Sequence, residues 1–306
     1  MSAGIRPPAE VTIEGAVVRA LLEEQHADLA HLSLADAGEG WDNKLFRLGD
    51  DYVVRLPRRA IAAPLIESEH RWLPRLSTGL PLPIPVPLRL GRPGCGFRWP
   101  WSIGRWFDGR TALETAPSDA ARTAAVLGEF VRALHCPAPA DAPTNRWRGV
   151  PLESRTTQLR EHLEQAGAVV EHRAAIELWD RALATPAWSG PPLWIHGDLH
   201  PGNLVVREGQ LAAVIDFGDL AAGDPATDLA IAWMLFPAET RPAFFAAARG
   251  AFDPIDVDTA MRARGWALAL GLAYLAHSRD DPGFRTLALA TIDAALGEGS
   301  RSQPDL

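Results

Sequence analysis

Two short β-branched runs late in the chain, Val205-Val206 and Ala213-Val214-Ile215, are separated by the turn sequence Glu208-Gly209-Gln210. Runs of this composition predict strands, and the short glycine-containing turn predicts that the two strands pair as a β-hairpin. Because a hairpin folds back on itself, it brings Asn203 and Asp216, which flank it, to the same end. Their side-chain oxygens can then reach one metal cluster.

Polar side chains suited to chemistry precede and follow this hairpin, in His196-Gly197-Asp198-Leu199-His200-Pro201-Gly202-Asn203 and in Ile215-Asp216-Phe217-Gly218-Asp219. Glycine and proline keep the first stretch out of helix, so it forms a loop. Transfer of a phosphoryl group needs a carboxylate that orients and deprotonates the attacking hydroxyl, and oxygen ligands for Mg²⁺ on a nucleoside triphosphate. Asp198 fits the first role, and Asn203 and Asp216 fit the second.

These two stretches resemble the motifs of the aminoglycoside phosphotransferase family of small-molecule kinases, and the resemblance continues through the N-terminal part of the chain. It implies an α+β, bilobal protein-kinase-like fold. A small N-terminal lobe with an antiparallel sheet (1–108) would bind the nucleotide, and a larger, mainly helical C-terminal lobe (109–306) would hold the catalytic and substrate-binding groups. It also implies Mg²⁺ with ATP or GTP as cosubstrate, Asp198 as catalytic base, His200 near the transferred phosphate and His196 as a brace for the loop.

The N-terminal region has the strand pattern of a small sheet. Strands are predicted at 32–34, 44–48, 52–56, 88–90 and 97–107. Gly38 and Gly40 lie between the first two strands, where the resemblance implies a loop over the nucleotide phosphates, since glycine lets backbone N–H groups approach an anion closely. At the end of the last strand the resemblance implies a hinge around Arg105 and Phe107, whose exposed backbone would pair with the base. This sequence does not distinguish ATP from GTP.

An apolar stripe with helical spacing runs from Leu65 to Leu76 and includes Glu69. A buried carboxylate is costly unless it is paired, so we expect Glu69 to pair with Arg55. Arg55 stands where the family has a lysine on the nucleotide phosphates, and a guanidinium is always charged and can bind phosphate through two N–H groups. The alternative is that Glu69 simply reaches solvent. Pro74 is expected to break or kink this helix.

The C-terminal region is predicted to be mainly helical. Besides the helix expected over 12–25 in the N-terminal region, helices are expected from a cap at Ser118 or Asp119 to Leu134, over 153–183 as one or two helices, and from Ala226 onward. Asp224 or Thr227 is a candidate cap for the last of these. The resemblance implies that Asp228 bonds to the backbone of the 196–203 loop and holds its shape, whereas ordinary capping is the other interpretation.

Several classes of protein fit this composition poorly. The formal net charge of −8 argues against a nucleic-acid partner. Two cysteines are too few for a disulfide framework. The first ten residues lack the apolar core of a signal peptide, and the apolar run 266–276 is too short to cross a bilayer, so we expect a cytoplasmic protein without a membrane partner.

Other active sites fit the motifs less well. His196 and His200 are four residues apart, as in a zinc-binding helix, but Gly197 and Pro201 interrupt such a helix. No Gly-x-Ser-x-Gly sequence supports a serine hydrolase. A non-catalytic nucleotide-binding regulator and a metabolite kinase for a sugar or amino alcohol stay open as alternatives.

The expected partner is a small molecule with a hydroxyl acceptor, such as an antibiotic. Aromatic residues of the last helices could form walls for a macrolide, and they are Trp233, Phe236, Phe244, Phe245, Trp266 and Tyr274 with Met234. Carboxylates could bind an aminoglycoside, and they are Asp253, Asp256, Asp258, Asp280 and Asp281. Both acceptors stay open, and the sequence does not set the oligomeric state.

Overall fold

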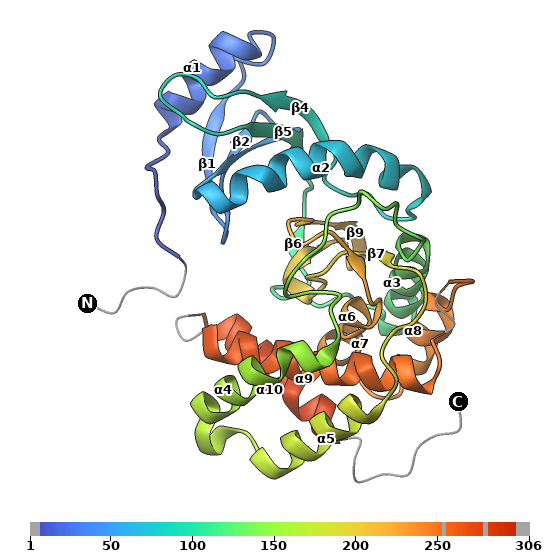
Figure 1. Cartoon of the computed structure of the whole chain (residues 1–306). Helices are drawn as coiled ribbons and strands as arrows, with labels where there is room; N and C mark the ends of the chain where they lie inside the picture. The colour runs from blue at the N-terminus through green and yellow to red at the C-terminus, as the bar shows by residue number, and fades with distance from the viewer. Residues whose placement is uncertain (1–6, 253–254, 278–280, 298–306) are drawn as a thin grey trace. The chain divides into compact units, whose positions relative to one another are not determined.

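The computed structural model describes residues 7–252, 255–277 and 281–297, and the chain forms two compact units (Figure 1). The first unit comprises the chain up to Thr78, Pro83–Asp108 and Val214–Gly218. The second comprises Gly79–Leu82, Gly109–Ala213 and the chain from Asp219 onward. The segment that carries Asp216 therefore belongs to the first unit, although it lies far beyond residue 108.

A five-stranded antiparallel sheet forms the centre of the first unit, in the order β1-β2-β3-β5-β4. Its strands are β1 (Leu34–Glu39), β2 (Asn43–Leu48), β3 (Tyr52–Pro57), β4 (Pro87–Gly91) and β5 (Trp101–Arg105). All five lie within or next to the predicted strand segments. The helices of this unit are α1 (Gly15–Gln25) and α2 (Ala63–Leu76), and each packs near the sheet (Figure 1).

The core of this unit lies between the sheet and α1. Leu21 and Leu22 of α1 are fully buried, as are Leu48 of β2 and Leu56 of β3. Burying one such side chain contributes roughly 1.5–3 kcal/mol, so this layer holds the sheet together. Helix α1 begins at Gly15, three residues later than the sequence predicted.

Helix α2 presents Ile66, Glu69, Trp72 and Leu73 as its buried face. Of the two expected effects of Pro74, a break or a kink, the break does not occur, because the helix continues to Leu76. Proline in the last turn removes only one backbone N–H donor, and the helix ends before further hydrogen bonds would be lost.

The second unit is mainly helical and also contains short strands. Its helices are α3 (Ala120–Leu134), α4 (Thr156–Ala166), α5 (His172–Ala184), α6 (Ala226–Leu229), α7 (Ile231–Leu235), α8 (Arg241–Ala248), α9 (Val257–His277) and α10 (Pro282–Gly297). Its strands are β6 (Arg110–Thr111), β7 (Leu193–Ile195), β8 (Leu204–Arg207), β9 (Gln210–Val214) and β10 (Ala221–Gly223), of which β9 ends with one residue in the first unit. The fold class is therefore α+β, as predicted.

Helix α9 is the centre of the helical packing, with α4, α5, α6 and α10 against it. Two glycines allow this close approach. A Cβ added to Gly265 would lie 2.7 Å from the Cβ of Ala182 on α5, and one added to Gly271 would lie 2.9 Å from Ile292 on α10. None of the helices in the described ranges has the length and apolar character that a membrane crossing requires.

Local sequence patterns predicted several of these elements correctly. The side chain of Asp119 accepts a hydrogen bond from the N–H of Arg122 (2.9 Å), which confirms it as the cap of α3. The predicted β-hairpin is formed by β8 and β9. Its turn residues Glu208 (φ 54°) and Gly209 (φ 76°) both have positive φ, as a two-residue hairpin turn with matching twist requires.

Asp224 does more than cap a helix. Its Oδ1 accepts a hydrogen bond from the N–H of Ala226 (3.0 Å), which is a capping contact at the start of α6. Its Oδ2 lies 2.8 Å from Nε of Arg262 on α9, and both side chains are about 6% exposed. This buried ion pair joins α9 to the segment that precedes α6.

Candidate active site

The loop 196–203 joins β7 to β8 in the second unit, and glycine fixes its path. Gly197 has φ +84°, a conformation that L side chains rarely adopt. A Cβ added there would lie 2.4 Å from the carbonyl oxygen of Asp219, so the two segments pass too closely for any other residue. The residue after Gly197 is Asp198, the predicted catalytic base.

A buried carboxylate anchors the start of this loop. Asp228 on α6 is fully buried, and it accepts hydrogen bonds from the backbone N–H groups of His196 (2.7 Å) and Gly197 (2.8 Å). These are the contacts that the resemblance implies for Asp228. The Nε2 of His135, which follows α3, lies 3.3 Å from the same carboxylate. His135 and Asp228 are 93 positions apart in the sequence, so no local sequence signal connects His135 with this site.

Hydrogen bonds within the loop hold the next residues. The N–H of Asp198 donates to Nδ1 of the fully buried His196 (3.2 Å), and Nδ2 of Asn203 donates to the carbonyl of Asp198 (2.9 Å). The N–H of Gly202 donates to Nδ1 of His200 (3.0 Å). Because Nδ1 of His200 accepts, its Nε2 carries the proton, and it lies 3.4 Å from the Asp198 carboxylate.

The Asp198 carboxylate is 24% exposed and is surrounded by donors. Nη2 of Arg148 lies 3.2 Å from its Oδ1, and the hydroxyl of Tyr274 donates to the same oxygen at 3.3 Å. Burial alone would favour the neutral acid. The neighbouring His200 and Arg148 outweigh it and hold the pKa of Asp198 well below its usual range. Asp198 is therefore an anion at neutral pH.

Arg148 and Tyr274 are parts of the site that the sequence did not reveal. Arg148 belongs to a loop without regular structure, and its Nε lies 3.8 Å from Asp219. Asp219 in turn accepts a hydrogen bond from Nδ2 of Asn145 (2.6 Å). Tyr274 is one of the aromatic residues that the sequence offered as acceptor walls. Burial, followed by the charge of Asp198, raises its pKa well above the ordinary value. An isolated arginine or tyrosine carries no signal of such a contact.

In the first unit, Arg55 of β3 and Glu69 of α2 form the predicted ion pair. Two guanidinium nitrogens of Arg55 contact the two carboxylate oxygens of Glu69, with Nη2 to Oε1 at 3.0 Å. Glu69 is only 1% exposed, so the pairing is what makes its burial tolerable. Burial disfavours the charge of Arg55, but Glu69 raises its pKa above the ordinary value. The charges of Asp216 and Asp42 act in the same direction.

The predicted phosphate loop is the β1–β2 hairpin. Its two glycine N–H groups are engaged within the hairpin: that of Gly38 donates to Oδ1 of Asp36 (2.7 Å), and that of Gly40 donates to the carbonyl of Asn43 (2.8 Å). The carbonyl of Gly40 also accepts a hydrogen bond from the buried Arg58 (3.0 Å). In this conformation the N–H groups of Gly38 and Gly40 are already hydrogen-bonded within the hairpin.

The remaining predicted residues of the first unit lie at the surface. Arg105 ends β5 and is exposed, and Phe107 is half-buried. Asp216 is exposed and has φ 64°, while the following Phe217 is almost fully buried. The buried phenyl ring fixes the chain, and the strained backbone turns the Asp216 carboxylate toward solvent.

Within the described ranges, no three His, Cys, Asp or Glu side chains lie close enough to hold a metal ion. Mg²⁺ commonly takes only one or two protein ligands and completes its shell with water and substrate phosphates. Asn203 fits such a site, because its Nδ2 already donates to the loop and its Oδ1 is left to accept. The exposed carboxylate of Asp216 also suits this hard cation.

Most of the predicted acceptor-binding residues have other roles or lie outside the described residues. Asp256 caps α9 through the N–H of Thr259 (2.8 Å), and Oδ1 of Asp281 accepts the N–H groups at the start of α10. Asp253 and Asp280 lie outside the described residues. Five of the seven listed candidate wall residues are buried in the core: Trp233, Met234, Phe236, Phe244 and Trp266.

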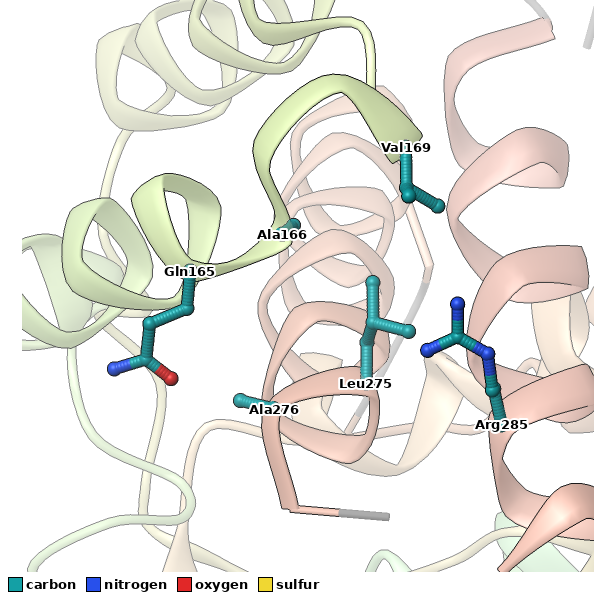
Figure 2. Close-up of a pocket in the computed structure, with 6 residues that line it drawn as sticks. All are labelled: Gln165, Ala166, Val169, Leu275, Ala276 and Arg285. Atoms are coloured by element: carbon teal, nitrogen blue, oxygen red, sulfur yellow. The ribbon is translucent and has the colours of Figure 1, made fainter. Parts of the chain in front are cut away.

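A separate hollow lies in the helical unit. It has a volume of about 280 Å³, and its lining residues come from α4, the turn after it, α9 and α10 (Figure 2). They are Gln165, Ala166, Val169, Leu275, Ala276 and Arg285. None of the predicted site residues lines it.

Comparison with known proteins identifies the fold and the family. The chain resembles an aminoglycoside 2'-phosphotransferase-IIIa solved as a GDP complex, with 21% identity, a TM-score of 0.67, and coverage of 94% of this chain and 99% of that one. It also resembles the macrolide 2'-phosphotransferase MphH from Brachybacterium faecium, with 25% identity, a TM-score of 0.58, and coverage of 93% and 99%. A macrolide 2'-phosphotransferase type I gives 19% identity, a TM-score of 0.62, and coverage of 94% and 99%.

A search of curated proteins finds no significant match. The model of the phosphotransferase enzyme family, in contrast, matches residues 33–266, which is well over half of the chain. The matched range includes the 196–203 loop, the Asp216 segment and the Arg55–Glu69 pair. The chain thus has the fold of these phosphotransferases, and it belongs to the phosphotransferase enzyme family.

Proposed function

We propose that this protein transfers the γ-phosphoryl group of ATP or GTP to a hydroxyl of a small molecule in a Mg²⁺-dependent reaction. The observation that carries the proposal is the ionised Asp198 carboxylate, held on a loop whose backbone is fixed by the buried Asp228. A carboxylate of this kind can orient an acceptor hydroxyl and accept its proton.

The reaction follows from these groups. The acceptor oxygen forms a bond to the γ-phosphorus, the bond between that phosphorus and the β–γ bridging oxygen breaks, and the nucleoside diphosphate leaves. Asp198 aligns the acceptor hydroxyl and takes its proton as the new bond forms. His200 has its Nε2–H toward the same carboxylate and supplies a donor beside the transferred group.

On the nucleotide side, we assign Arg55 to the phosphates, with Glu69 setting the direction of its guanidinium fork. The hairpin around Gly38 and Gly40 covers the phosphates once its internal hydrogen bonds rearrange. The backbone around Arg105 and Phe107 binds the base.

We assign Asn203 and Asp216 as the residues that would hold Mg²⁺, with the nucleotide phosphates supplying further oxygen ligands. When bound, the ion neutralises the charge that develops on the phosphate oxygens. Several similar structures carry GDP, ADP or ATP, which supports a nucleotide cosubstrate.

Antibiotics are the first acceptors to test. Similar structures include complexes with kanamycin and with streptomycin, and the macrolide enzymes named above belong to the same group of neighbours. The experiment incubates the protein with Mg²⁺, ATP or GTP and a panel of aminoglycosides, macrolides and metabolite alcohols, followed by mass spectrometry.

The expected result is a phosphoryl mass gain on one acceptor that falls by roughly 10²–10⁴ in rate for Asp198→Asn. The matched control is Asp180→Asn, which changes an exposed carboxylate on α5. Nucleotide binding without transfer to any acceptor would instead favour a non-catalytic regulator.

A further inference from the structure

The two oxygens of the Asp198 carboxylate have different surroundings. Oδ1 accepts hydrogen bonds from Nη2 of Arg148 at 3.2 Å and from the hydroxyl of Tyr274 at 3.3 Å. Oδ2 has a single contact in the part of the chain that the structure describes, with Nε2 of His200 at 3.4 Å. Each carboxylate oxygen has two lone pairs that can accept hydrogen bonds. Both positions on Oδ1 are therefore occupied, whereas Oδ2 keeps one position open.

The contact of His200 with Oδ2 is also a weak one. Hydrogen bonds from N–H to oxygen usually span about 2.7–3.2 Å, and this contact is longer. The imidazole is fixed by other groups: the N–H of Gly202 donates to its Nδ1 (3.0 Å), and the rings of Tyr274 and Phe284 lie edge-on to it at 5.5 and 5.3 Å. It is therefore held beside Oδ2 rather than pulled onto it. The Asp198 side chain is partly exposed, so a small molecule can reach it.

The segment that carries Arg148 is held on both sides of that residue. Before it, Nδ2 of Asn145 donates to the carboxylate of Asp219 (2.6 Å). After it, Gly149 has φ +66°, and its N–H donates to the hydroxyl of Thr227 (3.0 Å). The guanidinium is thus presented to the carboxylate by a backbone that is fixed at two points.

Tyr274 is connected to the same framework through its helix. Arg262, on the same helix α9, forms a buried ion pair with Asp224, with Nε to Oδ2 at 2.8 Å. The N–H of Asp224 donates to the carbonyl of Gly149 (2.9 Å), next to Arg148. Asp224 therefore joins the two elements that supply the donors of Oδ1.

We infer that Arg148 and Tyr274 are positioning residues that hold Asp198 through Oδ1, so that the acceptor hydroxyl binds Oδ2. The inference rests on the proposed kinase function and assigns the atom at which the reaction begins. The acceptor proton passes to Oδ2 as the acceptor oxygen forms its bond to the γ-phosphorus. The bond from that phosphorus to the β–γ bridging oxygen breaks, and the nucleoside diphosphate leaves with its electron pair. Neither positioning residue touches the reacting atoms.

Replacing Tyr274 by phenylalanine distinguishes the two oxygens, because it removes only the hydroxyl. If the acceptor bound Oδ1, the Tyr274 hydroxyl would compete with it, and Tyr274→Phe would lower the KM for the acceptor or raise kcat. If the acceptor binds Oδ2, the variant loosens the carboxylate. In that case kcat should fall roughly 10-fold, the value of one hydrogen bond to a charged group, with the acceptor KM unchanged.

The assay uses the full chain with Mg²⁺ and ATP or GTP. The acceptors are kanamycin, streptomycin, erythromycin and water, and transfer is followed by mass spectrometry and by release of nucleoside diphosphate. Water competes for Asp198 as an alcohol does, so its rate responds in the same direction. The matched control is Tyr52→Phe on β3 of the first unit, which changes the other of the two tyrosines and should leave kcat and KM unchanged.

Arg148 gives a second and independent variant. Arg148→Gln should lower kcat roughly 10- to 100-fold with little change in the KM for nucleotide, and Arg148→Lys should recover part of the loss, because it keeps the charge but not the planar fork. Arg173→Gln, an exposed arginine that pairs with Glu177 on α5, is the control. Tyr274→Phe added to Asp198→Asn should cause no further loss of rate, because a positioning residue acts only through the carboxylate.

The contact of Tyr274 can also be measured without turnover. The chain has two tyrosines, so protein labelled with ¹³C at the tyrosine Cζ gives two signals, which Tyr52→Phe and Tyr274→Phe assign. Asp198→Asn should shift the signal of Tyr274 and not that of Tyr52, because it changes the acceptor of one hydroxyl only. Two unshifted signals would show that Tyr274 does not hold the carboxylate and would overturn the inference.

The failure of the inference and the failure of the kinase function are distinguishable. If transfer depends on Asp198 but Tyr274→Phe has an unchanged or higher kcat, or a lower acceptor KM, the inference is wrong and the kinase function stands. If neither an antibiotic nor water receives the phosphoryl group, or the rate is the same in Asp198→Asn, the proposed function fails and the inference fails with it.

Discussion

Replacing Asp228 tests whether one buried carboxylate holds the catalytic loop. Its two oxygens accept backbone hydrogen bonds at 2.7 and 2.8 Å from His196 and Gly197, and the side chain is fully buried. A hydrogen bond to a charged group contributes about 1.5–3 kcal/mol, so Asp228→Ala should lower the free energy of unfolding by about 3–6 kcal/mol. Protein stabilities are typically about 5–15 kcal/mol, so this loss is large.

Asp228→Asn separates the shape of the side chain from its acceptors. The amide keeps one oxygen, but its NH₂ group would face one of the two backbone N–H donors. The free energy of unfolding should therefore fall by about half as much as in Asp228→Ala. In both variants, urea unfolding should show a lower midpoint with an unchanged slope. Hydrogen exchange gives a local measurement, because the amides of His196 and Gly197 should lose protection first.

The same variants connect the loop to catalysis. In Asp228→Asn, kcat should fall while the KM for nucleotide changes little, because Asp228 holds the segment that precedes Asp198 and no part of the first unit. Asp180→Ala, which removes an exposed carboxylate on α5, is the control. If Asp228→Ala is as stable as this control to within about 0.5 kcal/mol, the anchoring role is refuted.

Three further predictions concern other sites. Arg55→Ala removes the guanidinium that contacts both oxygens of the buried Glu69 carboxylate, so it should lower the free energy of unfolding by about 3–5 kcal/mol. Glu69→Gln, with Arg55 retained, should weaken nucleotide binding with a smaller loss of stability. Equal midpoints in urea for the wild type and Arg55→Ala would contradict this. Gly197→Ala should cost about 1–3 kcal/mol and abolish transfer, since its Cβ would meet the carbonyl of Asp219, and full activity would refute it. Because the pKa of His162 is lowered to about 4, the unfolded chain binds its proton first, so the free energy of unfolding should fall from pH 6.5 toward pH 4, and His162→Gln should flatten this dependence.

Local patterns in the sequence predicted the elements that position the site. The β8–β9 hairpin followed from two β-branched runs and one turn, and the Arg55–Glu69 pair followed from a carboxylate on an apolar stripe. Both depend on short spacings, because helical and strand periodicity decide which side chains share a face. Such arguments cannot reach contacts between distant segments.

The contacts around Asp198 are of this distant kind. Arg148 is 50 residues from Asp198 and Tyr274 is 76 residues away, and neither stands in a pattern that singles it out. The loop that carries Arg148 has no periodicity, so its path is set by close packing of Gly149 on β7 and β10. Only the folded chain shows that a tyrosine of α9 faces the candidate base.

The Arg148 contact bears on how Asp198 acts. A general base is most effective when its pKa is near the working pH, yet His200 and Arg148 hold the pKa of Asp198 well below its usual range. Asp198 is therefore a weak proton acceptor before reaction, and its main contribution is to orient the hydroxyl. This suits a loose transition state, in which the acceptor oxygen becomes acidic only as its bond to phosphorus forms.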